Sequence, residues 1–316
     1  MGRITYSVGL FILCVWQVAC NKTPISQELF DTFRRYAEIS AATFALPCPH
    51  PPQGIQIIRY IDNQTTSTQG LIAKDEAANE LIVAFRGTDN FIDAATDIDF
   101  GFTPFKTLGV TECVGCKVHK GFLKSWNSVA YDTINTVQEI LDSNPNMRIT
   151  ITGQSLGAAL ASLATTTFRG LGFNIKTYTF GQPRTGNQQY ADFVDDLTSR
   201  ETMFRVTHTN DGVPQMAPTA LGFRHHATEY WQSVDDPIAA KTFRCIGQEP
   251  VDCNNSLRGK GLGPLGIGIN KAHFHYAGVS VGNPLDRGST ICHGPKPRLF
   301  QSGSGRPYGS RGKKYF

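Results

Sequence analysis

The chain has 316 residues, of which 40% are hydrophobic and 18% charged, and its formal net charge is +4. A chain of this length and apolar content can bury a substantial core, and α/β folds of this size commonly form one domain. The excess positive charge gathers at the C-terminus, so no nucleic-acid-binding face is indicated and no nucleic-acid partner is expected.

The first residues have the three-part pattern of a secretory signal. Arg3 is followed by an apolar run from Val8 to Ala19 and then by Cys20. The run is too short to span a bilayer as a helix, and the small residues at its end indicate a cleavage site. We expect residues 1–20 to be removed and the protein to be extracellular. A lipid-modified Cys20 is disfavoured, because Gln17 stands where an aliphatic residue would be expected.

The C-terminal segment differs in composition from the rest. From Gly294 to Phe316 it is rich in Gly, Ser and Pro, with six Lys or Arg residues and no acidic residue. This composition predicts a disordered basic tail over residues 294–316 and leaves residues 21–293 as the folded domain. A solubilising role for the tail is favoured over contact with anionic surfaces.

Secretion bears on the cysteines and on two asparagines. Two of the eight cysteines fall in the predicted signal, and the even set that remains predicts disulfides in an oxidising compartment without fixing their pairing. The Cys113-x-x-Cys116 pair lacks a second pair at suitable spacing, so no metal site is predicted. Asn63 and Asn254 begin possible glycosylation sequons. The remaining cysteines are Cys48, Cys113, Cys116, Cys245, Cys253 and Cys292.

The first half of the domain reads as a helix followed by strands. Thr23-Pro24 is a typical helix start, and apolar residues follow on one face up to Tyr36. Strands are predicted over residues 54–61, 70–73 and 80–85. After an irregular stretch from Asp89 to Phe105, apolar residues at helical spacing from Phe122 to Leu141 predict one long helix.

The second half alternates strands and helices. Residues 147–152 have a strand pattern, and an Ala- and Leu-rich helix follows up to Arg169. A strand over residues 174–180, a helix ending at Leu197 and a strand over residues 202–207 come next. This alternation predicts an α/β fold with a mostly parallel central sheet that has helices on both faces.

The sequence Gly153-Gln-Ser155-Leu-Gly157 lies between the strand at 147–152 and its helix. This G-x-S-x-G pattern in a strand–turn–helix context is typical of a nucleophile elbow. The small residues allow the tight turn, which exposes the serine hydroxyl and directs the helix N-terminus and the Leu156 N–H toward a developing oxyanion. Ser155 is therefore the predicted nucleophile.

A serine nucleophile needs a base and a carboxylate that orients the base. In α/β-hydrolases the chain order is serine, acid, histidine. Asp211 fits the acid, because it lies just past a strand end, whereas other aspartates after Ser155 are better explained as surface residues. His225 and His226 sit close behind Asp211, where exposed loop positions would explain them. The C-terminal candidates for the base are His273, His275 and His293.

Several motifs together resemble the fungal class 3 lipase family, which includes triacylglycerol lipases of filamentous fungi and a type A feruloyl esterase. The resemblance extends from about Thr23 to Cys292. The motifs are Phe85-Arg86-Gly87-Thr88, Gly153-Gln154-Ser155-Leu156-Gly157, Tyr178-Thr179-Phe180-Gly181-Gln182-Pro183-Arg184-Thr185-Gly186-Asn187, Phe204-Arg205-Val206-Thr207-His208-Thr209-Asn210-Asp211-Gly212-Val213-Pro214 and Ala272-His273-Phe274-His275-Tyr276.

The resemblance implies an α/β-hydrolase fold and a complete catalytic set. Ser155 matches the family nucleophile, Asp211 the acid and His273 the base, while His275 does not match the histidine position. Thr88 and Leu156 match the oxyanion-hole pair. The family needs no cofactor or metal. Its disulfides imply the pairs Cys48–Cys292, Cys113–Cys116 and Cys245–Cys253.

Two features depart from the family pattern. The residue before the nucleophile is usually His in the family and is Gln154 here. This change is not expected to abolish the chemistry, because that side chain is not a member of the triad. The basic tail has no counterpart in the family pattern.

The substrate is expected to depend on the segment after Asp89, which is a lid in this family. Phe91, Ile92 and Phe100 are its predicted substrate-contacting residues, but three aspartates follow Ile92, and Ala94 stands where the lipases place Trp. A triacylglycerol lipase acting as a monomer at a lipid–water interface is the first interpretation. The alternatives are a feruloyl esterase, supported by the spacing around the Cys113 pair, and a catalytically silent secreted effector, against which the complete triad argues.

Overall fold

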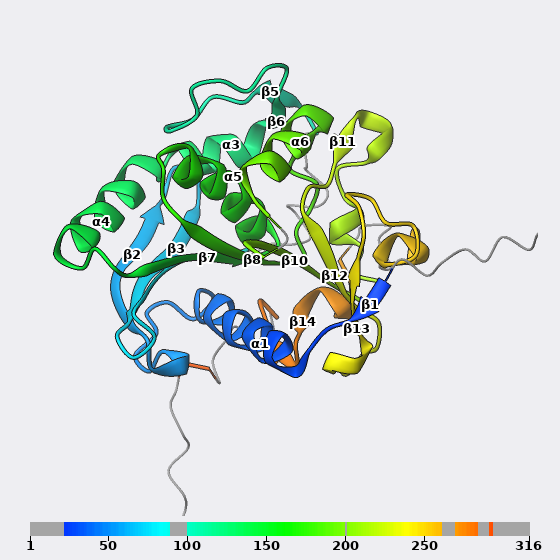
Figure 1. The fold of residues 1–316 in the computed structure, drawn as a ribbon, viewed down its shortest axis with the longest axis horizontal. Helices are drawn as coiled ribbons and strands as arrows, with labels where there is room; N and C mark the ends of the chain where they lie inside the picture. The colour runs from blue at the N-terminus through cyan, green and yellow to red at the C-terminus, as the bar shows by residue number, and fades with distance from the viewer. Residues whose placement is uncertain (1–21, 89–99, 200, 261–268, 284–290, 293–316) are drawn as a thin grey trace, which may run out of the picture.

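The computed structural model describes residues 22–88, 100–199, 201–260, 269–283 and 291–292. Within these residues the core of the fold is a nine-stranded sheet in the order β1-β13-β12-β10-β8-β7-β4-β3-β2 (Figure 1). The strands are β1 (Lys22–Pro24), β2 (Gln56–Asn63), β3 (Thr68–Asp75), β4 (Glu80–Phe85), β7 (Arg148–Gln154), β8 (Ile175–Phe180), β10 (Met203–His208), β12 (Thr228–Gln232) and β13 (Thr242–Cys245).

The middle of this sheet is parallel and both of its ends are antiparallel. β4, β7, β8, β10 and β12 run in the same direction, with β7 in register against both β4 and β8. β2 and β3 extend one end in antiparallel pairs, and β13 and β1 extend the other. The predicted parallel sheet therefore forms the centre, and the strands β12, β13 and β1 add an edge that the sequence analysis did not anticipate.

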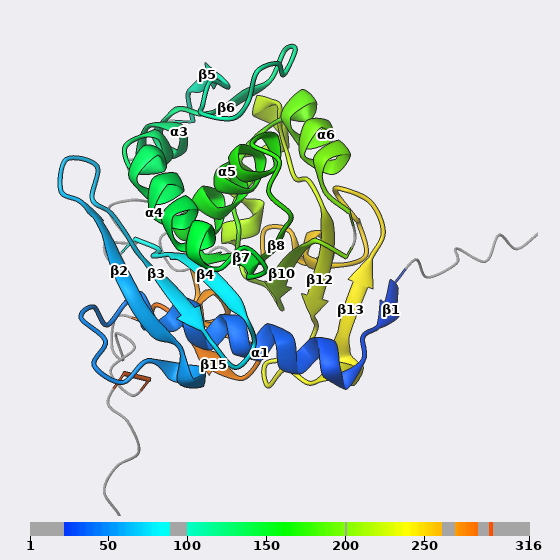
Figure 2. The same cartoon turned by 60° about the vertical axis from the view of Figure 1, so that its left-hand side comes forward.

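Helices cover both faces of the sheet, as expected for the α/β class (Figure 2). α1 (Gln27–Ala42) lies on one face, and α3 (Lys120–Asn127), α4 (Ala130–Ser143), α5 (Leu156–Gly170) and α6 (Gln188–Leu197) lie on the other. Each face has its own apolar core, one formed with α1 and one with α3 to α6. In the described part of the chain, none of the helices has the length and apolarity required to span a membrane.

Short elements complete the described chain. A small sheet combines β5 (Phe102–Pro104), β6 (Lys117–His119), β9 (Gly186–Asn187) and β11 (Phe223–Arg224), and β14 (His275–Tyr276) pairs with β15 (Val279–Ser280). The 3-10 turns are Pro52–Gly54, Val213–Gln215, Thr219–Leu221, Ala239–Lys241, Asn254–Leu257 and Lys271–Phe274.

The predicted start of the first helix at Thr23-Pro24 is wrong. These residues belong to β1, which pairs with β13. Proline is tolerated there because an edge strand leaves one row of N–H groups unpaired. The helix begins at Gln27, after Ser26 caps it by accepting a 3.2 Å hydrogen bond from the Leu29 N–H.

The predicted long helix is two helices, α3 and α4, separated at Ser128 and Val129. The break has a tertiary cause. The Ser128 carbonyl accepts a 3.1 Å hydrogen bond from the Asn63 side chain, and the Ser128 hydroxyl contacts Thr66 at 2.7 Å. The turn between β2 and β3 therefore takes the polar groups that a continuous helix would use, which periodicity along the chain cannot reveal.

The three disulfides join the pairs that the family resemblance implies: Cys48–Cys292, Cys113–Cys116 and Cys245–Cys253. The predicted signal and tail lie outside the described residues.

The parallel strands bring the predicted site together at one edge of the sheet. Thr88 follows β4, Ser155 follows β7, Gly181 follows β8 and Asp211 follows β10. Because the carboxyl ends of parallel strands share an edge, the four segments converge there, where ligand sites of α/β folds commonly lie.

Candidate active site

Ser155 occupies a strained turn between β7 and α5. Its backbone dihedral angles are φ 57° and ψ −123°, a conformation that non-glycine residues rarely adopt. A Cβ atom added to Gly153 would lie 2.3 Å from the Gly157 carbonyl oxygen, and one added to Gly157 would lie 2.2 Å from the Phe85 carbonyl oxygen. The two glycines are therefore required by close backbone contacts, as the G-x-S-x-G motif predicts.

Asp211 lies in the loop after β10 and is fully buried with three hydrogen-bond donors. Its Oδ1 accepts a 2.9 Å bond from the Val213 N–H, and its Oδ2 accepts a bond from the Tyr276 hydroxyl. The Nδ1 atom of His273 lies 3.1 Å from Oδ1 and 3.0 Å from Oδ2. A buried carboxylate is stable only when it is paired in this way. The structure thus brings Asp211 and His273 together, as the sequence predicts.

Tyr276 is a residue of the site that the sequence analysis quoted within a motif but gave no role. Burial and the negative charge of Asp211 raise its pKa well above the ordinary value for tyrosine. Its hydroxyl therefore stays protonated at neutral pH and donates to the carboxylate. The signal in the sequence was the Ala-His-x-x-Tyr spacing, which placed the side chain near His273 without showing its contact.

Gly181 follows β8 and lies against the same group of side chains. It has φ +59°, and an added Cβ atom would lie 2.7 Å from the Tyr276 hydroxyl, 2.9 Å from Asp211 Oδ2 and 3.0 Å from His273 Cε1. Both its backbone conformation and this close approach require glycine. The motif contained this residue, but the sequence gave no physical reason for it.

Asn254 holds the loop that carries Asp211. Its side-chain amide nitrogen donates to the carbonyl oxygens of Thr209, at 3.2 Å, and Asp211, at 2.9 Å, and its Oδ1 accepts a 3.2 Å bond from Gln215. The residue is 3% exposed. The nitrogen that a glycan would occupy is therefore engaged inside the fold, so the possible sequon at Asn254 is a structural asparagine in the folded chain. Asn63, the other sequon, donates to Ser128.

Thr88 and Leu156, the predicted oxyanion-hole residues, lie on segments that meet. Leu156 is the first residue of α5, directly after Ser155. Thr88 follows Gly87, and a Cβ atom added to Gly87 would lie 3.0 Å from the Gln154 carbonyl oxygen. Both residues are thus next to the turn at Ser155.

Phe100 is the described member of the three predicted substrate-contacting residues, since Phe91 and Ile92 lie outside the described residues. Its ring centre is 6.4 Å from that of Phe223 and 6.5 Å from that of His119. Phe223 in turn stacks on Phe102, with 4.0 Å between ring centres. Phe100 therefore belongs to an aromatic cluster on the small sheet.

Among the described residues, the candidate histidines His225, His226 and His275 form no hydrogen bond with Asp211. His225 and His226 are buried rather than exposed, which corrects the expectation of loop positions on the surface. Burial and the neighbouring Arg205 lower the pKa of both, that of His226 to about 3. His275 is half-buried, with its pKa lowered by burial and by His208. His293 lies outside the described residues.

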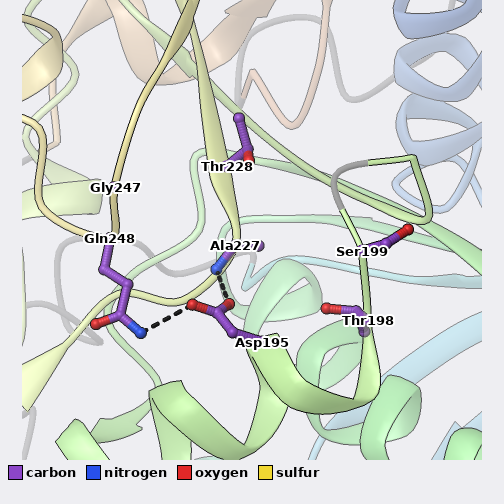
Figure 3. Close-up of a pocket in the computed structure, with 7 residues that line it drawn as sticks. All are labelled: Asp195, Thr198, Ser199, Ala227, Thr228, Gly247 and Gln248. Atoms are coloured by element: carbon purple, nitrogen blue, oxygen red, sulfur yellow. Dashed lines mark hydrogen bonds between the residues drawn. The ribbon is translucent and has the colours of Figure 1, made fainter. Parts of the chain in front are cut away.

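A separate cleft of about 230 Å³ lies at the N-terminal end of β12 (Figure 3). In the parallel part of the sheet this end is opposite to the carboxyl-terminal edge where Ser155 lies. Asp195 lines it, accepts a 2.6 Å hydrogen bond from the Ala227 N–H and contacts Gln248 at 2.8 Å. This agrees with the view that Asp195 is not the triad acid. The lining residues are Asp195, Thr198, Ser199, Ala227, Thr228, Gly247 and Gln248.

Comparison with known proteins gives the same picture. Residues 82–221 match the family described as Lipase (class 3). The secreted mono- and diacylglycerol lipase 1 of Fusarium solani is 35% identical to this chain, over 70% of this chain and 63% of its own length. The secreted mono- and diacylglycerol lipase A of Penicillium cyclopium is 37% identical, over 54% of this chain and 54% of its own length. The chain thus spans less than two thirds of the length of these curated relatives.

Solved structures extend the similarity to most of the chain. The crystal structure of a lipase from Rhizopus microsporus var. chinensis is 28% identical, with a TM-score of 0.73, and covers 89% of this chain and 100% of its own. The sheet, the turn at Ser155 and the segments that converge on it therefore have counterparts in a known fold. In its family match over residues 82–221 and in its fold, the chain is therefore similar to the class 3 lipases.

Proposed function

We propose that the chain is a secreted serine hydrolase of carboxylic esters that cleaves acylglycerols through Ser155, His273 and Asp211. The observation that carries the proposal is the double contact of His273 Nδ1 with the Asp211 carboxylate, beside a serine held in a nucleophile elbow. This arrangement leaves Nε2 as the ring nitrogen that can take a proton from Ser155.

The proposed reaction is acyl transfer in two steps. Ser155 Oγ attacks the ester carbonyl carbon while His273 Nε2 takes the hydroxyl proton, and Asp211 stabilises the imidazolium. The N–H groups of Leu156 and Thr88 are proposed to bind the oxyanion. The tetrahedral intermediate then collapses, and the alcohol leaves with the proton from His273. A water molecule next attacks the acyl carbon and gives a proton to His273, which returns it to Ser155 Oγ as the acyl–oxygen bond breaks and the carboxylic acid leaves.

Acylglycerols are the proposed substrates because the curated relatives are named as mono- and diacylglycerol lipases. The apolar residues Phe91 and Ile92 of the predicted lid are consistent with an apolar acyl chain. Secretion is supported by the signal pattern in the sequence, by the names of the relatives and by the three disulfides. The monomeric state stays a prediction.

Two measurements test this proposal. Ser155→Ala is expected to lower the kcat for p-nitrophenyl butyrate by on the order of 10⁴-fold or more, and equal turnover by the variant and the unmodified protein would refute the hydrolase. Parallel hydrolysis of emulsified tributyrin and methyl ferulate tests the substrate class. Faster turnover of tributyrin is expected, and a clear preference for the ferulate would replace the lipase by a feruloyl esterase.

A further inference from the structure

Gln154, the residue that departs from the family pattern, contacts the proposed catalytic base directly. It is the last residue of β7, and its fully buried side chain points to the same face of the sheet as Thr150 and Thr152. The Gln154 Nε2 atom lies 2.9 Å from the carbonyl oxygen of His273 and 3.1 Å from His273 Nε2.

These two distances fix the orientation of the amide. A carbonyl oxygen has no hydrogen to donate, so the Gln154 atom beside the His273 carbonyl must be the NH₂ nitrogen and not the oxygen. One hydrogen of this group goes to the carbonyl, and the other points to His273 Nε2. The ring proton then resides on Nδ1, where it faces both oxygens of Asp211.

We infer that Gln154 is a positioning residue that fixes the orientation and tautomer of the His273 ring, with its amide on the Nε2 atom that is proposed to take the proton from Ser155. The inference rests on the proposed function, because it assigns a partner to the nitrogen that takes the proton. Within the described chain the Ser155 hydroxyl makes no hydrogen bond, whereas the Gln154 amide occupies Nε2. Bound substrate would require the amide to release this lone pair or to share it.

The two polar atoms of the Gln154 amide differ in how well they are paired. Gln154 Oε1 is buried, and in the described residues it has no hydrogen-bond partner. It lies 3.0 Å from the position of a Cβ added to Gly87 and 3.1 Å from that of a Cβ added to Gly282. An unpaired buried carbonyl is costly, so removing Oε1 with an apolar side chain of the same length would offset part of the cost of removing the donor to the His273 carbonyl.

The contact has a consequence for the pH dependence of the reaction. A donor on Nε2 stabilises the neutral imidazole, and a proton added to Nε2 would face the amide hydrogens. Removing this donor is therefore expected to shift the acid limb of the rate profile. Among the described residues, the other titratable groups facing this segment are Asp211, Tyr276 and His208, whose Nδ1 lies 3.1 Å from the Ala272 carbonyl oxygen, and the variants below leave them unchanged.

The test is the pH profile of kcat/KM for p-nitrophenyl butyrate in Gln154→Met and Gln154→Glu. Methionine keeps the length and removes the donor, so the acid limb should move to higher pH by about 0.5 to 1 unit. The Tm should fall by several degrees, because the buried His273 carbonyl also loses its donor. Glutamate places a negative charge beside Nε2, so its acid limb should move further in the same direction. A Gln154→Met variant that loses activity equally at every pH, with its acid limb in place, would show a packing role and overturn the inference.

A matched control exists at Gln182, a buried glutamine whose Nε2 lies 3.0 Å from His226 Nε2, away from Asp211. Gln182→Met removes the same kind of contact and should leave the acid limb where it is. Gln154→Asn, which keeps the amide but is too short to reach His273, should shift the limb as Gln154→Met does and replaces it if that variant does not fold. Titration with a phosphonate ester corrects each rate for the fraction of reactive serine.

The two possible failures are separable. If Ser155→Ala is as active as the unmodified protein, the proposed function is wrong and the pH profiles concern another site. If activity depends on Ser155 but every Gln154 variant keeps its acid limb, only the inference about Gln154 is wrong.

Discussion

Two serines of the α5 segment differ in their surroundings: Ser155 precedes the helix as its N-cap and has His273 as its proposed base, and Ser162 lies in the middle of the helix beside His226. Ser162 is fully buried, and its hydroxyl lies 2.7 Å from His226 Nε2 and 2.8 Å from the Tyr190 hydroxyl. Ser155 makes no such hydrogen bond in the described chain but stands in a strained turn next to α5. Ser162, which is not the proposed nucleophile, thus forms a direct hydrogen bond with a histidine.

The difference lies in the second nitrogen of each ring. His273 Nδ1 faces the Asp211 carboxylate, whereas His226 Nδ1 has no partner among the described residues. Burial and Arg205 lower the pKa of His226 to about 3, so this ring is a weak base at neutral pH. A serine–histidine hydrogen bond thus does not by itself make a nucleophile. The carboxylate behind the imidazole and access to the hydroxyl are also required.

The largest expected contrast is between the two serines. Ser155→Ala should lower kcat by on the order of 10⁴-fold or more, whereas Ser162→Ala should change kcat less than about threefold and lower stability by about 1 kcal/mol. Initial rates with p-nitrophenyl butyrate and urea unfolding of both variants measure this. If Ser162→Ala folds normally but is inactive, the proposal that Ser155 is the nucleophile is contradicted.

The next largest contrast is expected between Tyr276, which donates to Asp211, and Tyr190, which contacts Ser162. Tyr276→Phe removes one of the donors to Asp211 and should lower kcat by about 10- to 100-fold, because a hydrogen bond to a charged group contributes about 1.5–3 kcal/mol. Tyr190→Phe removes the bond to Ser162 and should leave kcat unchanged. Steady-state kinetics at saturating substrate compare the variants. Equal losses of activity would mean that Tyr276 acts through the fold and not through Asp211.

His226, which has no carboxylate partner among the described residues, should affect the stability of the fold and not the activity. The folded chain keeps His226 neutral down to a pKa of about 3, while the ordinary value of 6.5 applies on unfolding. As the pH falls from 6.5 toward 3, the unfolded chain takes up a proton that the folded chain does not, so this residue destabilises the fold.

When the pH is lowered from 7 to 5, the free energy of unfolding should therefore decrease by about 2 kcal/mol less in His226→Gln than in the unmodified protein. Urea unfolding at the two pH values measures the difference. His50→Gln, at an exposed histidine, is the control. A similar pH dependence in the unmodified protein and His226→Gln would show that His226 does not contribute.

The turn at Ser155 was predictable from the residue pattern alone, and the long-range pair of Asp211 and His273 was predictable through the family resemblance, but other long-range contacts of the fold were not. The turn at Ser155 depends on neighbours such as Gly153 and Gly157, whose required contacts act over a few residues. The pairing of β1 with β13 joins Lys22 to Cys245, which no pattern along the chain indicates.

The sequence analysis was wrong about the burial of two polar loop residues. His225 and His226 were expected on the surface because polar residues mostly lie there. They are buried because charged groups distant in sequence surround them: Arg205 Nε donates to the His226 carbonyl oxygen at 3.1 Å, and Glu249 accepts a 2.9 Å bond from the His225 N–H. Only the folded chain brings these groups together.

Asn254 offers the smallest expected effect, and it separates a structural asparagine from a glycosylated one. Asn254→Ala frees the carbonyl oxygens of Thr209 and Asp211 and should lower kcat/KM by about 10-fold, because Asp211 loses a fixed position. Ser256→Ala destroys the same sequon but keeps the asparagine, so its kcat/KM should stay within about twofold. Intact-mass analysis of the secreted protein should find no glycan at this site. A glycan on Asn254 in active enzyme would mean that the Asp211 loop is held by other contacts.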